Sequence, residues 1–337
     1  MPSLPKPRLR RSARARADGN ALQQAPPEPR VEVVEHGGLR WINIERPTPV
    51  DRGWLEEHFD FHPLDYEDVQ SRNQRPKIDE YPDYLFIVLH FPRFDKRAGR
   101  LQAAELNLFV AEDLMITLPN EPLKPLSALW SRCERSEAAR EQYMGKGPGF
   151  LLYEIVDTMY DYCFPILDKI GFKLDLIEDA LFEGESDDLV RDISNTKQEI
   201  INYRRIVKPQ RTVLRLLDRS SQRFAPTDLD IYFDDIVDKS ERIWDLLENY
   251  KEVAEALEAT NESVISHRVN DILRALTAIS VIVLPLTLIA SVFGMNVGLP
   301  GGGDPAAGGS VTYWVIVGAL LAILIGMVAY FRFTRWL

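Results

Sequence analysis

The residues that could handle an ion lie along one face of an uncharged segment near the C-terminus. Alternating steps of three and four residues lead from Asn270 to Ser291, so all of these positions share one face of a helix. Four of the five positions inside the uncharged segment carry hydroxyl groups, whereas Ile, Val, Leu and Ala dominate the other faces. Asn270 and Leu273 come before these five positions, which we call the polar stripe: Thr277, Ser280, Leu284, Thr287 and Ser291.

Neutral oxygens at this spacing suit a hydrated cation. Neither uncharged segment contains a carboxylate, which a site for dehydrated Mg²⁺ would be expected to use. Because Mg²⁺ gives up its water reluctantly, a ring of oxygens could bind the ion through its water shell, from Asn270, Thr277, Thr287 and Asn296. The seven-residue recurrence is typical of helices packed around a common axis, as in a cyclic oligomer. Alternatively, the hydroxyls bond back to their own helix or join neighbouring helices.

Two uncharged segments are long enough to cross a membrane. Residues 275–293 and 311–331 each approach the roughly 20 residues that span a hydrocarbon core as a helix. Arg residues precede the first segment and follow the second, while the loop between them has no Lys or Arg. The positive-inside rule then places both termini in the cytoplasm. We expect a pore-lining first span, an external loop at 294–310, a second span and a cytosolic tail at 332–337.

The sequence of the N-terminal third predicts a disordered tail followed by an α/β domain. Residues 1–30 are rich in Pro, Arg and Ala, and we expect a disordered, basic tail. Residues 31–125 contain short, partly β-branched apolar runs of strand length, such as Tyr84 to Phe91, separated by Gly and Pro. This pattern indicates a cytosolic α/β domain.

Helical periodicity dominates the remaining cytosolic part, residues 126–274. Apolar residues recur at spacings of three and four from Phe150 to Phe182, and again from Asp187 to about Arg219. Pro226-Thr227-Asp228 is a start signal, after which neither Gly nor Pro occurs until Pro285. The sequence therefore predicts one long stalk helix from Asp228 to Phe293, which continues into the membrane.

The composition excludes several classes of function. The chain has a formal charge of −11, and its basic tail lacks the interleaved aromatic residues that would favour nucleic-acid binding. Cys133 and Cys163 have no CxxC spacing, so the sequence indicates neither a disulfide framework nor a cysteine zinc site. Phosphate-binding loops, nucleophile elbows and HExxH helices are absent. We expect no enzyme, no catalytic cofactor and no nucleic-acid partner.

A short motif stands at the end of the first span. Gly294-Met295-Asn296 follows Leu284-Pro285-Leu286-Thr287, with the second span and a basic C-terminal end behind it. This arrangement resembles the CorA family of metal-ion transporters, over roughly Val31 to Leu337 and most closely from Asp271 onward. The resemblance implies a funnel-shaped homopentamer with an α/β cytosolic domain and long stalk helices that continue into the pore.

The resemblance also implies roles for individual residues. Gly294-Met295-Asn296 would form the selectivity filter, with Asn296 as its outer ring and the other two residues shaping the turn. Leu273 and Leu284 are candidate hydrophobic gates, and Asn270 marks the cytosolic mouth. Family members are gated by metal bound between cytosolic domains. The acidic candidates for this regulatory site are Asp234, Asp235 and Asp238, which could equally form a solvated helix face.

The loop after the motif leaves the transported ion open. CorA magnesium channels commonly carry an acidic Met-Pro-Glu-type loop, whereas residues 297–302 look more like the ZntB zinc-transporter branch. That branch usually differs at the middle residue of the tripeptide, where Met295 stands. The prediction is channel-type Mg²⁺ uptake, with Zn²⁺, Co²⁺ or Ni²⁺ as the alternative cation and a membrane-anchored sensor without a pore as a more distant alternative. The expected location is the inner (plasma) membrane, with membrane lipid and copies of the same chain as partners.

Overall fold

The computed structural model divides the chain into two compact units. The first unit comprises Met1–Lys173 and Asn195–Lys251, and the second comprises Leu174–Ser194 and Glu252–Leu337. The described residues are 28–71, 74–95, 99–183, 188–221, 224, 229–293 and 310–334.

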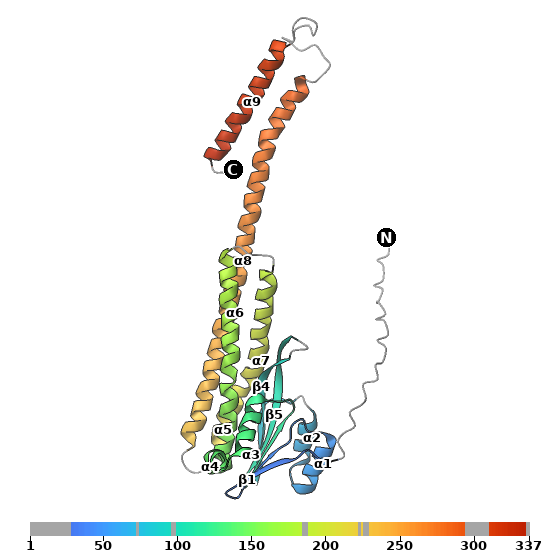
Figure 1. The fold of residues 1–337 in the computed structure, drawn as a ribbon, viewed down its shortest axis with the longest axis vertical. Coiled ribbons are helices and arrows are strands. Elements are labelled where there is room, and N and C mark those ends of the chain that lie inside the picture. The colour runs from blue at the N-terminus through green and yellow to red at the C-terminus, as the bar shows by residue number, and fades with distance from the viewer. Residues whose placement is uncertain are drawn as a thin grey trace, which may run out of the picture. The chain divides into compact units, whose positions relative to one another are not determined.

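A six-stranded sheet forms the centre of the first unit (Figure 1). Its strand order is β1-β2-β6-β5-β4-β3, and all neighbouring strands are antiparallel except β2 and β6. Gly37 and Gly38 join β1 to β2, with φ values of 59° and 89°. Glycine suits both positions because a two-residue type I′ hairpin turn needs positive φ at each of them. The strands are β1 Glu32–His36, β2 Leu39–Asn43, β3 Lys77–Glu80, β4 Tyr84–Asp95, β5 Arg100–Ala111 and β6 Leu114–Pro119.

Helices cover both faces of this sheet. On one face, Leu55 of α1 and Tyr66 of α2 join a buried cluster with Phe86 and Phe109. On the other face, the rings of Trp41 and Trp130 lie 4.8 Å apart. The helices on the first face are α1 Pro49–His58 and α2 Pro63–Ser71, and the elements on the second are α3 Lys124–Arg135, α4 Glu137–Met144 and α5 Pro148–Asp161. The predicted α/β domain is therefore present, with its core divided between the two faces.

One predicted helix is two helices in the structure. The periodicity from Phe150 to Phe182 predicts one helix, but α5 ends at Asp161 and α6 begins at Cys163. Pro165 accounts for the break, because a proline lacks an N–H and its ring clashes with the carbonyl of the residue four positions earlier. The break is confined to Tyr162, and α5 packs against β5 and β6.

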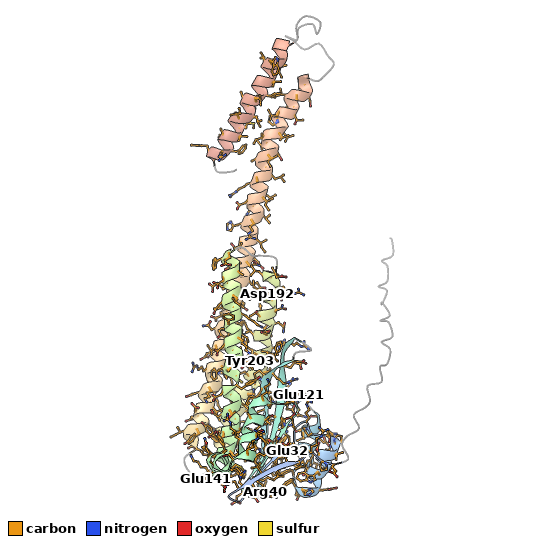
Figure 2. The ribbon with its side chains drawn as sticks, viewed as in Figure 1. Glu32, Arg40, Glu121, Glu141, Asp192 and Tyr203 are labelled. Carbon is orange, nitrogen blue, oxygen red and sulfur yellow. The ribbon has the colours of Figure 1, made fainter. Side chains whose placement is uncertain are left out.

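Three long helices follow with a common burial pattern: α6 Cys163–Glu183, α7 Leu189–Ser221 and α8 Asp230–Phe293. Each buries residues at alternating spacings of three and four, which is the pattern of helices packed side by side. In the first unit, the hydroxyl of Tyr203 on α7 (labelled in Figure 2) donates to the carbonyl oxygen of Cys163 at 3.0 Å. The buried positions of α6 are Cys163, Leu167, Ile170, Leu174, Ile177 and Leu181.

Both cysteines are buried thiols, and we predict that neither reacts in the folded protein. Burial raises the pKa of Cys133 to about 11 and the pKa of Cys163 to about 12. The reactive thiolate is therefore scarce at neutral pH. We expect iodoacetamide at pH 7.5 to leave both residues unmodified until denaturant is added, as measured by intact-mass spectrometry. Modification of native protein within minutes would contradict this prediction.

The second unit contains the two candidate membrane spans. Helix α9, Ser310–Phe333, packs on the C-terminal part of α8, where Ala278, Ile282 and Phe331 are buried together. Both helices are long and apolar enough to cross a membrane, with mean hydropathies of 2.3 and 2.5 in their most apolar windows. The long helix and the two C-terminal apolar helices expected from the sequence are confirmed.

Candidate functional site

The polar stripe lies on the face of α8 that points away from α9. The contact with α9 is made by Ala278 and Ile282, with Leu286 partly buried beside them. At about 100° per residue, the centre of the stripe lies roughly 180° around the helix from this contact. All five stripe residues are exposed in the isolated chain. One face of α8 is thus committed to α9, and the opposite face is left for another contact or for water.

Three of the four stripe hydroxyls already use their protons. The side-chain oxygens of Thr277, Ser280 and Thr287 donate to the carbonyl oxygens four residues earlier, at 2.7, 2.8 and 2.8 Å. These bonds match the alternative in which the hydroxyls bond back to the backbone of their own helix. They also fix what the hydroxyls offer outward, because a hydroxyl that has donated its only proton presents lone pairs alone. Acceptor oxygens suit a cation, or the outward-pointing hydrogens of its water shell.

Of the remaining predicted pore residues, the structure describes those on α8 but not the tripeptide that follows it. Asn270, Leu273 and Leu284 are exposed on α8, with 52% of Leu273 and 67% of Leu284 accessible. Large apolar side chains that are this open have no partner within the described part of the chain. Gly294-Met295-Asn296 lies outside the described residues, so the roles given to the tripeptide stay predictions.

The three aspartates predicted to form the regulatory metal site do not converge on one point. Asp234, Asp235 and Asp238 are exposed on α8, and among the described residues they do not form a cluster of converging oxygens. Asp235 lies 3.4 Å from the ammonium of Lys239, one helical turn further on. Asp234 and Asp238 share a neighbouring face of α8.

Helix α5 supplies two carboxylates that the sequence reading missed. The ammonium of Lys239 lies 2.5 Å from Asp157 and 2.9 Å from Asp161, both on α5. Three carboxylates therefore meet one ammonium, leaving net negative charge. The spacing of Asp157 and Asp161, four residues apart on a predicted helix, was the available signal. The sequence alone could not show that they face α8.

Partial burial shapes the electrostatics of this carboxylate group. Burial raises the pKa of Asp157, and the negative charges of Asp161 and Asp235 add to this effect against the opposing pull of Lys239. Burial works to lower the pKa of Lys239, but its hydrogen bonds to Asp157 and Asp161 outweigh burial and raise it. The lysine is therefore charged at neutral pH and holds α5 to α8 by ion pairs. A divalent cation could compete with it for the same oxygens.

A second acidic group lies beside the sheet, where Asp65, Asp68 and Asp79 have carboxylate oxygens within 4.8 Å of one another. Lys77 contacts Asp79 and lies 2.7 Å from Asp68, so its ammonium takes the place a cation would occupy. The hydroxyl of Tyr84 donates to Asp65 at 2.8 Å. This group is thus internally paired and serves to hold α2 against β3 and β4.

Comparison with known proteins bears on whether the chain is a transporter or a membrane-anchored sensor. The model of the family described as "CorA-like Mg2+ transporter protein" matches residues 36–333. The chain belongs to this family. Because its members are channel-type membrane transporters of divalent cations and not enzymes, the expectation of a non-enzymatic transport protein is confirmed.

Two curated relatives match nearly the whole chain. The "Cobalt/magnesium transport protein CorA" of Thermotoga maritima is 28% identical over 303 residues, covering 88% of this chain and 83% of the relative. The "Putative metal ion transporter YfjQ" of Bacillus subtilis is 28% identical over 308 residues, covering 91% of this chain and 93% of the relative.

Solved structures confirm the fold. The CorA magnesium transporter of Methanocaldococcus jannaschii superposes with a TM-score of 0.76 at 20% identity, covering 89% of this chain and 92% of that one. The cytoplasmic domain of ZntB from Vibrio parahaemolyticus gives a TM-score of 0.58 at 15% identity, covering 68% of this chain and 88% of that one. At such identities these likenesses concern the fold alone, so the ZntB domain gives no support to zinc as the ion.

Proposed function

We propose that this chain forms a homopentameric channel for Mg²⁺ uptake across the inner (plasma) membrane. The observation that carries the proposal is the polar stripe, which lies opposite the α9 contact on a helix of a CorA-family chain. Relatives named as magnesium or cobalt transporters cover most of the sequence. Both termini lie in the cytoplasm, and lipid surrounds the apolar outer faces of the spans.

The two faces of α8 account for assembly. With α9 packed on one face, five copies of α8 place their stripes around a common axis, as closed cyclic symmetry requires. The exposed apolar residues on the flanks of α8, such as Ile272 and Leu276, then pack against neighbouring copies or lipid. Native mass spectrometry in detergent is expected to give a mass near five chains of 38.6 kDa.

Conduction follows from the outward-facing lone pairs. A hydrated Mg²⁺ presents the hydrogens of its water shell, which rings of Thr277 and Thr287 oxygens accept while the ion keeps its water. Binding through water is weak enough to allow quick release, as conduction demands. Asn296 forms the outer selectivity ring, and Leu273 and Leu284 form constrictions that close by excluding water.

In this proposal, cytosolic carboxylates control the opening and closing of the channel. Asp234, Asp235 and Asp238 sense metal, with Asp157 and Asp161 adding oxygens at the Lys239 contact. Bound metal offsets the repulsion among these charges and favours one arrangement of the long helices. When cytosolic metal falls, the repulsion returns and the constrictions can widen and wet.

Ion identity is tested by flux into proteoliposomes containing the purified chain. We expect Mg²⁺ entry well above that of empty liposomes, and slower entry of Zn²⁺, Co²⁺ and Ni²⁺ at equal concentration, measured with ion-selective dyes. Faster Zn²⁺ entry would favour the ZntB-like alternative. No flux of any of these ions would favour the anchored sensor.

The regulatory assignment predicts a specific loss of inhibition. Replacing Asp234, Asp235 and Asp238 together with Asn removes their charges at nearly constant shape. We expect the triple variant to conduct Mg²⁺ at high cytosolic metal, where the wild type is inhibited, because it lacks the carboxylates through which bound metal stabilises the closed arrangement. Asp245→Asn, an exposed aspartate on the same helix, is the control and should stay inhibited. Unaltered inhibition of the triple variant would place the sensor elsewhere.

A further inference from the structure

The edge of the sheet at β4 is closed by a side chain from a distant helix. Strand β3 pairs with β4 only as far as Val88, opposite Lys77, so among the described residues no strand pairs with Leu89–Asp95 on that side. Unpaired strand edges expose backbone N–H and C=O groups that must find other partners. His90 is the first residue beyond the end of β3 whose backbone groups point to this open side.

Gln210 of α7 supplies these partners. The backbone N–H of His90 donates to Oε1 of Gln210 at 2.9 Å, and Nε2 of Gln210 donates to the His90 carbonyl at 2.5 Å. The second proton on Nε2 is directed at the carbonyl of Ile206, 3.2 Å away. Gln210 is 1% exposed, so its amide is fully bonded inside the protein and imitates the next strand.

The residue after Gln210 joins the same helix to α8. Arg211 pairs with Glu241, which also accepts from Arg215 at 2.7 Å. Two guanidinium groups lie over the ring of Trp244, that of Arg204 at 4.9 Å and that of Arg211 at 5.2 Å from the ring centroid. One turn of α7 thus contacts the sheet through Gln210 and contacts α8 through Arg211.

The Gln210 contact differs in kind from the Lys239 contact. The Lys239 ion pairs join α8 to α5, and a divalent cation can compete for their carboxylates. The Gln210 amide bonds are neutral, buried and directed at backbone, so cations and salt have little effect on them. The sheet is therefore joined to α8 by two routes, one through α5 by the Lys239 ion pairs, and one through α7 by the neutral Gln210 bonds in series with the Arg211–Glu241 ion pair.

We propose that Gln210 is a positioning residue that couples the sheet to α8 through α7, giving the metal-controlled movement of α8 a fixed pivot. The regulatory part of this inference rests on the proposed transport function, whereas the coupling itself does not. Without the pivot, release of the ionic attachment would leave α8 free of the sheet, so that metal binding no longer biases its position.

The test uses Gln210→Met, which keeps the volume and removes both bonds, with Gln198→Met as the matched control. Gln198 lies on the same helix, where its amide contacts only Asn202 on the exposed surface among the described residues. The first readout is hydrogen exchange of the full chain in detergent. We expect exchange of the His90 amide to rise about tenfold or more in Gln210→Met, exchange of the α8 amides near Glu241 and Trp244 to rise with it, and neither to change in Gln198→Met.

The second readout is Mg²⁺ flux in proteoliposomes as a function of metal on the cytosolic side. Gln210→Met is expected to keep the basal flux at low metal and to shift the inhibitory midpoint by about threefold or more. Unchanged His90 exchange, or raised His90 exchange with unchanged α8 exchange, would overturn the coupling. Both exchange changes with an unshifted midpoint would overturn the regulatory role. A wild type that moves no ion would overturn the proposed function, while exchange would still decide the coupling.

Discussion

Asn296→Ala is expected to lower Mg²⁺ flux by about tenfold or more while the oligomer still assembles. In the proposed channel, five amide oxygens at the outer end of the first span accept hydrogens from the ion's water shell. Hydrogen bonds to charged partners contribute roughly 1.5–3 kcal/mol each, so loss of the ring weakens entry strongly. The measurement is initial Mg²⁺ flux in proteoliposomes, with native mass recorded on the same sample.

Asn249→Ala provides the matched control for this experiment. Asn249 is an exposed asparagine on the same long helix, within the first unit. Its replacement should leave flux and mass unchanged. If Asn296→Ala transports at the wild-type rate with the wild-type preference among ions, Asn296 has no part in selection.

Leu284→Ser should produce a channel that conducts Mg²⁺ even when cytosolic metal is high. Leu284 is 67% exposed at the middle of the polar stripe, where a ring of leucines would exclude water from the axis. A hydroxyl in its place lets the constriction wet and lowers the barrier to a hydrated ion. We expect a rise in flux on the order of tenfold at inhibitory metal concentration.

Ile279→Ser tests whether this effect depends on the face of the helix. Ile279 is 52% exposed and lies five residues before Leu284, about 140° away around the helix. The same polar substitution there should not raise flux at inhibitory metal. Equal leaks from both variants would point to general loosening of the span, and a silent Leu284→Ser would remove this residue from the gate.

Local patterns predicted most of the elements. The absence of Gly and Pro after Asp228 predicts the long helix, and the structure has α8 from Asp230 to Phe293. The apolar, partly β-branched run from Tyr84 to Phe91 predicts a strand, which is found within β4. These predictions succeed because each depends on residues that are neighbours in the sequence. Strand β6, Leu114–Pro119, was missed because a six-residue apolar run carries little periodicity of its own.

Contacts between distant segments were beyond the reach of a single sequence. Asp157 meets Lys239 across 82 positions, and His90 meets Gln210 across 120. Neither pair has a local signal, since Gln210 reads as one more polar residue on a helix. The break between α5 and α6 was missed for a different reason. Apolar spacing continues through Pro165, so periodicity alone predicts one helix, although a proline at this position favours a break.

The central claim, that the polar stripe faces an aqueous ion pathway, is tested most directly by cysteine accessibility. Ser280→Cys and Thr287→Cys place thiols on the stripe, while Ala278→Cys and Ile282→Cys place them at the α9 contact. The native Cys133 and Cys163 are buried, so they need not be removed. A charged methanethiosulfonate reagent is expected to block Mg²⁺ flux through the first two variants and to spare the other two. Block at Ala278 and Ile282 with none at Ser280 and Thr287 would contradict the account.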